Sequence, residues 1–169
     1  MRRRWASLGS AIFFFAAPGT VAGLVPWWIT KWQFMPPPAG LSSIRWAGIA
    51  VIVAGLVPLV DAFARFAWQG LGTPAPIAPP TRLVVSGYYR HVRNPMYVAV
   101  VIILIGEAIL FADGGVLVWA AAFWLICNVF VLAYEEPILA RTFGNSYDRY
   151  RANVPRWIPR LVPWKSPAD

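Results

Sequence analysis

The side chains best suited to bind a ligand are concentrated in one short stretch, residues 87–97, which reads Gly-Tyr-Tyr-Arg-His-Val-Arg-Asn-Pro-Met-Tyr. It contains two arginines, the only histidine of the chain and three tyrosines, and a long apolar run follows it. Pro95 suits the first turn of a helix, where its missing N–H costs nothing, and Asn94 suits the N-cap. The start of a helix carries free N–H groups and a partial positive charge. The stretch therefore predicts a polar loop that leads into a helix N-terminus and binds an anionic group.

A pair of carboxylates, Glu135-Glu136, is expected to face this loop. The apolar run Pro95–Phe111 predicts one helix, Asp113-Gly114-Gly115 predicts a tight turn, and Val116–Tyr134 predicts a second helix. Two helices joined by so short a turn are antiparallel, so the second one returns the chain to the side that it left. We therefore predict that the acidic pair and the polar loop, about forty residues apart in sequence, form one site at one membrane face.

The composition is that of an integral membrane protein. Of the 169 residues, 59% are hydrophobic and only 13% are charged, whereas soluble domains are about 25% charged. The net charge of +8 would suit a nucleic acid. The basic residues, however, lie at the ends of apolar runs, where they set membrane topology, and we predict no nucleic-acid partner. The single Cys127 lies inside an apolar run and is predicted to be a small buried hydrophobe.

Two further apolar runs bring the predicted number of membrane helices to about four. About 20 residues cross the hydrocarbon core of a bilayer, and Ser10–Ile29 reaches this length after a basic start that would also suit a signal peptide. We predict a membrane helix there, kinked near Pro18 or Pro26. Ile44–Phe66 predicts the next one. The predicted fold class is therefore all-α: a polytopic membrane protein formed by one domain, residues 1–169.

The segments between and after these helices are expected to be loops and short helices. Trp68–Pro80 is rich in Pro, Gly and Ala and predicts a linker, and Thr81–Tyr89 predicts an ordered loop. The tail from Pro137 is amphipathic and basic and predicts two short helices, the second near Tyr147–Asn153. On the second membrane helix, Asp61 and Arg65 are four residues apart and are expected to pair.

The basic residues predict the orientation in the membrane. The face with the N-terminus, the linker and the tail has thirteen of the fifteen Lys and Arg residues, and the other face has only Lys31 and Arg45. By the positive-inside rule, both termini and the predicted site lie in the cytoplasm.

Three motifs, in order, resemble those of a family of membrane methyltransferases that includes isoprenylcysteine carboxyl methyltransferases and phospholipid N-methyltransferases. Residues 93–99 are similar to the Arg-His-Pro-x-Tyr-x-Gly signature, with Asn94 in place of His and Ala99 in place of Gly. The acidic pair is the second motif. The third is Phe-Gly-x-x-Tyr-x-x-Tyr at residues 143–150, followed by Val-Pro-Arg-x-Ile-Pro at residues 154–159. The resemblance covers about residues 83–159 and makes residues 81–160 the expected catalytic core.

The resemblance implies S-adenosylmethionine as the methyl donor, which as a cytosolic metabolite agrees with the predicted orientation. Methyl transfer from a sulfonium is an in-line displacement, so the enzyme must position the two reactants and exclude water. A glutamate would bind the amino group and ribose of the donor, a basic group would bind its carboxylate, and aromatic rings would face the sulfonium or the adenine. The predicted catalytic residues are Arg93, Glu136 and Arg151. The predicted cofactor-binding residues are Tyr89, His91, Arg93, Asn94, Pro95, Tyr97, Glu135, Glu136, Tyr147 and Tyr150.

The methyl acceptor stays open at this point. A lipophilic substrate from the bilayer is expected, either a prenylcysteine-like carboxylate, which needs only a cation to orient it, or a phospholipid-like amine, which must lose a proton to a base or water. His91 is either such a base or a hydrogen-bonding residue, and Glu107 is either a functional intramembrane charge or a side chain that reaches the interface. Two other functions are compatible with the motifs: a non-catalytic membrane scaffold or lipid-binding protein, and an NADPH-dependent enzyme similar to sterol reductases.

Overall fold

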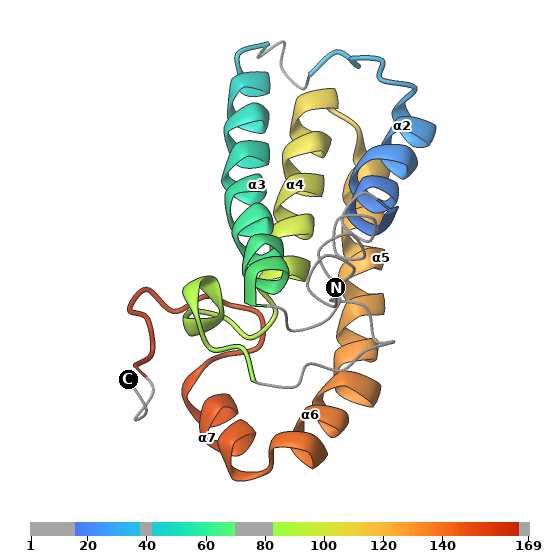
Figure 1. Cartoon of the computed structure of the whole chain (residues 1–169). Coiled ribbons are helices and arrows are strands. Elements are labelled where there is room, and N and C mark those ends of the chain that lie inside the picture. The colour runs from blue at the N-terminus through green and yellow to red at the C-terminus, as the bar shows by residue number, and fades with distance from the viewer. Residues whose placement is uncertain (1–15, 38–41, 70–82, 166–169) are drawn as a thin grey trace.

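The computed structural model describes residues 16–37, 42–69 and 83–165, which form a bundle of long helices with a smaller helical part at one end (Figure 1). The described residues contain helices and loops and no β-strand. The helical elements in chain order are η1 (Thr20–Leu24, a π-helical turn), α2 (Val25–Thr30), α3 (Ile44–Gln69), η3 (Gly87–Arg90, a 3₁₀ turn), α4 (Pro95–Phe111), α5 (Gly114–Phe130), η4 (Val131–Glu135, a π-helical turn), α6 (Glu136–Phe143) and α7 (Asn145–Asn153).

The first helix is irregular between its two prolines rather than at either of them. Residues 16–19 are α-helical, η1 forms the π turn, and α2 starts with Pro26 in its first turn. The indole N–H of Trp119 donates to the Val21 carbonyl at 3.0 Å, which ties this irregular segment to α5. The helix ends at Thr30, one residue beyond the predicted end, and residues 10–15 of the predicted span lie outside the described residues.

Helices α3 and α4 pack against each other through small residues. A Cβ atom on Gly106 would lie only 2.8 Å from the Gly48 carbonyl oxygen, and one on Gly55 would lie 2.8 Å from that of Ala99. Backbones that approach so closely leave no space for larger side chains, as in other membrane helix pairs. The buried core continues from this contact toward α5 and consists of Leu59, Phe63, Ala99, Val100, Ile103, Leu104, Val116 and Ala120. Helix α3 extends to Gln69, so the linker does not begin at Trp68 as predicted, and residues 70–80 lie outside the described part.

The predicted hairpin of α4 and α5 is present, but its turn is shorter than predicted, because Gly114 and Gly115 already belong to α5. A side-chain cap stabilises this turn. Ala112 ends α4 in the left-handed conformation, with φ of 56°. An Asp113 carboxylate oxygen then accepts hydrogen bonds from the N–H groups of Gly115, at 2.7 Å, and Val116, at 3.3 Å. This satisfies two of the free donors at the start of α5. Figure 1 shows the two helices running antiparallel, which brings residues 131–136 back toward the start of α4.

The prediction that the second helix of the hairpin ends at Tyr134 is wrong. The chain continues from α5 through η4 into α6, so residues 114–143 form one helical rod. Pro137 has no N–H to donate to a carbonyl four residues earlier, and a π turn with one extra residue precedes it, in which the Glu136 N–H donates to the Val131 carbonyl. The acidic pair is therefore inside a helix rather than beyond its end.

Two of the described helices are long and apolar enough to cross a membrane, Ile44–Arg65 and Gly114–Phe143. Helix α4 is apolar but shorter, with 17 residues. Large apolar side chains point away from the bundle on both long helices, among them Val53 and Val57 on α3 and Leu125 and Val129 on α5. These outward faces suit contact with lipid. The prediction of four membrane spans stays a prediction.

After α7 the chain returns along the polar loop as a segment without regular secondary structure, residues 154–165, which we call the C-terminal strap. It pairs with the loop through main-chain hydrogen bonds: the Arg93 N–H donates to the Pro155 carbonyl, and the N–H groups of Arg160 and Trp164 donate to the carbonyls of His91 and Arg90. These three bonds are 2.9–3.0 Å long. The predicted loop before residue 89 is ordered as well, because Leu83 and Val85 pack on the buried cluster of Tyr147, Tyr150 and Val154.

Candidate active site

The loop before α4 is positioned by a glycine and by the end of α3. Gly87 has a φ of 55°, and the Arg65 guanidinium lies directly against its Cα, in the space that a side chain would need. Arg65 in turn donates to Asp61 at 2.7 Å, which confirms the pair predicted from their spacing. Pro95 occupies the first turn of α4 as predicted. The Asn94 side chain does not cap this helix. Asn94 occupies the N-cap position as predicted, but its side-chain amide donates to the Arg156 carbonyl at 3.2 Å and so holds the strap.

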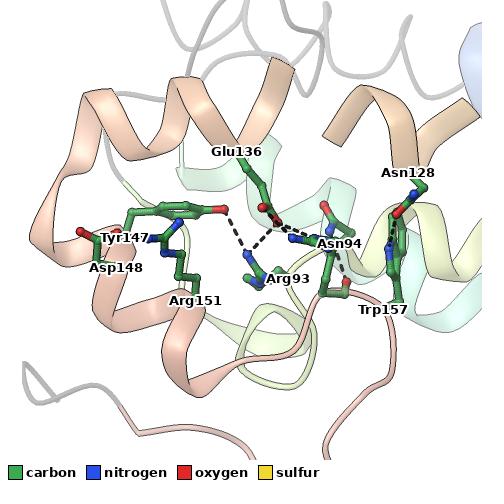
Figure 2. A network of polar contacts seen from close by, with 9 residues as sticks. Arg93, Asn94, Asn128, Glu136, Tyr147, Asp148, Arg151 and Trp157 are labelled. Atoms are coloured by element: carbon green, nitrogen blue, oxygen red, sulfur yellow. Dashed lines mark hydrogen bonds and ion pairs between the residues drawn. The ribbon is translucent and has the colours of Figure 1, made fainter. Parts of the chain in front are cut away.

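Glu136 is the centre of a polar network beside this loop (Figure 2). Its Oε1 accepts from Arg93 Nη1 and from Arg156 Nε, both at 2.7 Å, and its Oε2 accepts from Arg156 Nη2 at 2.9 Å. Arg93 Nη1 also donates to the Tyr147 hydroxyl at 3.2 Å. The Arg93 and Glu136 side chains are only 12% and 14% exposed. The bond to Glu136 raises the pKa of Arg156. One carboxylate thus holds two guanidinium groups from segments far apart in sequence.

Glu135 points to a different side of the helix from Glu136 and faces a cavity. Its Oε2 accepts a hydrogen bond of 3.4 Å from the Tyr97 hydroxyl. Glu135 is the last residue of the π turn and Glu136 the first residue of α6, and neighbouring residues on a helix point to different sides of it. The two adjacent acids consequently have different surroundings: Glu136 is bound by two arginines, and Glu135 has a tyrosine hydroxyl and the cavity.

The cavity has a volume of about 160 Å³ and lies between the first helix, α3, α4, α5 and η4. Its polar part includes Tyr89, Arg93, Asn94 and Glu135. The rest of the lining is mostly apolar and comprises Ala17, Pro18, Val21, Leu59, Phe63, Pro95, Met96, Tyr97, Val100 and Phe123. Sites that enclose a whole small ligand measure about 300–1,000 Å³. The cavity therefore fits the reacting part of a ligand, whose remainder would extend through the opening.

Buried tyrosines of α7 contact the polar loop that precedes α4. The Tyr150 hydroxyl donates to the Tyr89 carbonyl at 2.7 Å, and Tyr147 and Tyr150 are 1% and 3% exposed. Burial raises the pKa of Tyr89, Tyr147 and Tyr150, so all three hydroxyls stay protonated at neutral pH. Of the three, only Tyr89 lines the cavity. Tyr147 and Tyr150 therefore lie outside the cavity, where Tyr147 accepts a hydrogen bond from Arg93 and Tyr150 donates one to the loop.

Besides Tyr150, the predicted site residues Arg151 and His91 lie outside both the cavity and the Glu136 network. Arg151 pairs with Asp148 at 3.1 Å, and both side chains are 52% exposed, away from Glu136 (Figure 2). The prediction that Arg151 acts with Glu136 therefore has no contact to support it. The His91 Nδ1 is 2.8 Å from the Arg160 carbonyl, and because a carbonyl only accepts, this nitrogen has the proton.

Glu107 lies in the last part of α4, at the opposite end from Pro95.

Sequence reasoning missed two residues that fasten the strap to the bundle. The Trp157 indole N–H donates to the Asn128 side-chain oxygen at 2.9 Å (Figure 2). The Trp157 ring also lies 6.5 Å from that of Tyr97 and 6.0 Å from that of Trp124, measured between centroids. The available signal was a lone polar residue, Asn128, inside the apolar run of α5. An amide in such an apolar run needs a hydrogen-bond partner, but the sequence does not indicate which one.

The site and the apolar bundle together define a membrane protein with a polar pocket at one end, and comparisons with known proteins agree with this class. The model of the phospholipid methyltransferase family matches residues 43–146, more than half of the chain. A Schizosaccharomyces pombe protein-S-isoprenylcysteine O-methyltransferase is 35% identical over 82 residues, which are 48% of this chain and 34% of that protein. An uncharacterised Haemophilus influenzae protein is 35% identical over 63 residues, which are 37% of this chain and 100% of that protein.

The chain belongs to the phospholipid methyltransferase family, which confirms the resemblance found in its motifs. It spans about a third of the length of the S. pombe relative. Family membership and the two long apolar helices support a membrane methyltransferase.

Proposed function

We propose that this protein transfers a methyl group from S-adenosylmethionine to a lipophilic acceptor that enters from the bilayer. The observation that carries the proposal is one cavity with two opposite charges, Arg93 and Glu135, at its polar end and apolar side chains from membrane helices around the rest. Such a lining suits a ligand that is zwitterionic at one end and meets a hydrocarbon chain at the other. The cytoplasmic orientation and the four membrane spans belong to this proposal.

The residues fit the donor chemically. The Glu135 carboxylate would accept hydrogen bonds from the amino group or the ribose, and Tyr97 holds it in place. Arg93 would attract the donor's carboxylate, and Glu136 fixes its guanidinium while leaving its Nε without a protein partner among the described residues. When bound, the sulfonium supplies an electrophilic methyl group. The apolar walls around Phe63 and Phe123 would exclude water from the reacting atoms.

A base is needed only if the acceptor is an amine. His91 does not line the cavity, whereas Glu135 does. For an amine acceptor, the proton released on methylation would therefore pass to Glu135 or to water. A carboxylate acceptor would need no base and would be oriented by Arg93. Both acceptor classes stay within the proposal.

Binding and turnover of the Glu135→Gln variant test the proposal. The change keeps the shape of the side chain and removes its charge, and a hydrogen bond to a charged group contributes about 1.5–3 kcal/mol. We expect the dissociation constant for S-adenosylmethionine to rise about 10- to 150-fold, since each 1.4 kcal/mol is tenfold. Glu107→Gln is the matched control, because Glu107 is also a carboxylate on a membrane-facing helix but lies at the other end of α4. It should leave binding unchanged.

The assay would use purified protein in detergent, first for binding of the methyl donor and then for methylation of lipid extracts and prenylcysteine analogues, with mass analysis of the product. Equal donor affinity in the wild type and in Glu135→Gln would remove Glu135 from the site. Binding of NADPH in place of the methyl donor would favour the reductase-like function. Binding of lipid with no affinity for either cofactor would favour a non-catalytic lipid-binding protein.

A further inference from the structure

The outer side of the C-terminal strap exposes several large apolar side chains close together. Ile158, Leu161 and Val162 are 79%, 97% and 68% exposed, and all three lie within five residues. Single exposed apolar residues are ordinary on a protein surface, but a cluster of this kind marks a contact with a partner or a membrane. None of the three side chains takes part in the polar network around Glu136, so the proposed function does not explain them.

The strap is held in a fixed position, so this exposure is not that of a loose tail. Its inner side is bound by the main-chain hydrogen bonds to residues 90–93 and by the contacts of Arg156 with Glu136 and of Trp157 with Asn128. Val154 is 1% exposed and Trp164 packs on the same buried cluster. Because the inner side of the strap contacts the rest of the protein, Ile158, Leu161 and Val162 face outward.

The position of the strap along the membrane-crossing helices indicates what these three apolar side chains face. The Trp157 ring contacts Trp124, and its indole is bonded to Asn128, and both partners lie in the membrane-crossing rod Gly114–Phe143. Ile158 follows directly. In Figure 1 the strap, in red, runs at the level where α3 ends and α4 begins, whereas α7 lies farther from these helices. The apolar cluster is therefore at the edge of the apolar bundle, where a bilayer surface would be.

The charges of the strap agree with a membrane surface. Between residues 154 and 165 it has three basic residues and no acidic one. Of these, Lys165 is exposed. The strap also has two tryptophans, Trp157 and Trp164, and tryptophan is enriched at membrane–water interfaces. Apolar insertion combined with basic residues is the usual composition of segments that lie in the interface of an anionic bilayer.

We propose that the C-terminal strap lies in the membrane interface, with Ile158, Leu161 and Val162 inserted between lipids and Lys165 at anionic headgroups. The occupant of this surface is the bilayer that also surrounds α3 and α5. The strap is then fixed on two sides, by lipid outside and by the loop of the candidate site inside. This inference concerns placement and does not depend on methyl transfer.

A fluorescent label on the strap would test this placement. In a Cys127→Ala background, which removes the only cysteine, a single cysteine is introduced as Leu161→Cys, with Val162→Cys as a second position. Ala152→Cys on the exposed side of α7 is the matched control. Each variant is labelled with an environment-sensitive dye and reconstituted into vesicles of phosphatidylcholine and phosphatidylglycerol, with and without lipids brominated near the headgroup.

We expect the brominated lipids to quench the labels at 161 and 162 at least about twofold and aqueous iodide to quench them little, with the opposite pattern at 152. Lys165→Ala should reduce the lipid quenching at 161 in anionic vesicles and leave it unchanged in pure phosphatidylcholine. Equal iodide quenching at 161 and 152 would overturn the proposal. Energy transfer between labels at 161 on two copies, without lipid quenching, would also overturn it, since the surface would then be a contact between protein chains.

Discussion

The Glu136 network offers the sharpest test of how the site is held together. The Glu136→Gln variant keeps the size of the side chain but leaves the guanidinium groups of Arg93 and Arg156 without their shared counter-charge. Breaking a buried ion pair by removing one partner costs about 3–5 kcal/mol. Arg156 is 30% exposed and recovers part of its hydration, whereas Arg93 is 12% exposed and does not. We therefore expect a loss near the lower limit, about 3 kcal/mol.

Thermal unfolding in a fixed detergent or nanodisc would measure this loss. For a chain of this size, about 1 kcal/mol corresponds to about 2–4 °C, so the apparent Tm should fall by about 6–12 °C. Asp148→Asn is the matched control, because it removes the Asp148–Arg151 pair, in which both side chains are 52% exposed. Such a pair contributes about 0–1 kcal/mol.

A Glu136→Gln variant whose Tm stays within about 2 °C of the wild type, as for an exposed pair, would refute this reasoning. A double-mutant cycle with Arg156→Ala would separate the two arginines. The coupling energy should be smaller than the full loss, since Arg93 remains beside the substituted side chain.

Two further predictions concern packing and titration. Gly106→Val should lower the free energy of unfolding by at least about 1–3 kcal/mol, because its side chain would meet the Gly48 carbonyl and Ile52. Gly19→Ala, at a helical position with open space around it, should instead raise this free energy by up to about 1 kcal/mol. Thermal unfolding that does not distinguish the two variants would contradict the close helix contact. Burial raises the pKa of Tyr147 and Tyr150 above that of an unfolded chain, so the folded state holds these protons more tightly. Their contribution to stability should be complete below about pH 10 and be lost at higher pH. Ultraviolet titration should show these two phenols ionising above pH 10 or only on unfolding, and Tyr147→Phe or Tyr150→Phe should not reduce the number that ionise near pH 10; a reduction would show that the substituted phenol is accessible.

The elements of the hairpin were predictable from the sequence because local chemistry determines them. The bounds of α4 follow from Pro95, which suits a helix start, and from the apolar run that ends at Phe111. The turn follows from Asp113, which caps α5, although the two glycines that were predicted to belong to the turn are the first residues of α5. The pairing of Asp61 with Arg65 follows from their spacing on one helix. Each of these features depends on residues within a few positions of one another, and the predicted proximity of the acidic pair to the loop follows from the hairpin.

The contacts of individual side chains in the site could not be predicted from local sequence patterns. The sequence placed Glu135 and Glu136 together, but only the packing around them shows that Glu135 faces the cavity and Glu136 the arginines. Nothing in the local pattern distinguishes Arg151, which pairs with its neighbour on α7, from Arg156, which joins Glu136.

The sequence by itself determined the apolar helices, their turn and the family motifs, because helix-forming patterns and turn residues act over short distances. Only the tertiary structure decided which charges meet, how closely α3 approaches α4, and that the strap returns to cover the loop. Those outcomes depend on contacts between segments up to 74 residues apart, such as Arg90 with Trp164. Such contacts are selected by the packing of the whole chain, which no local pattern encodes.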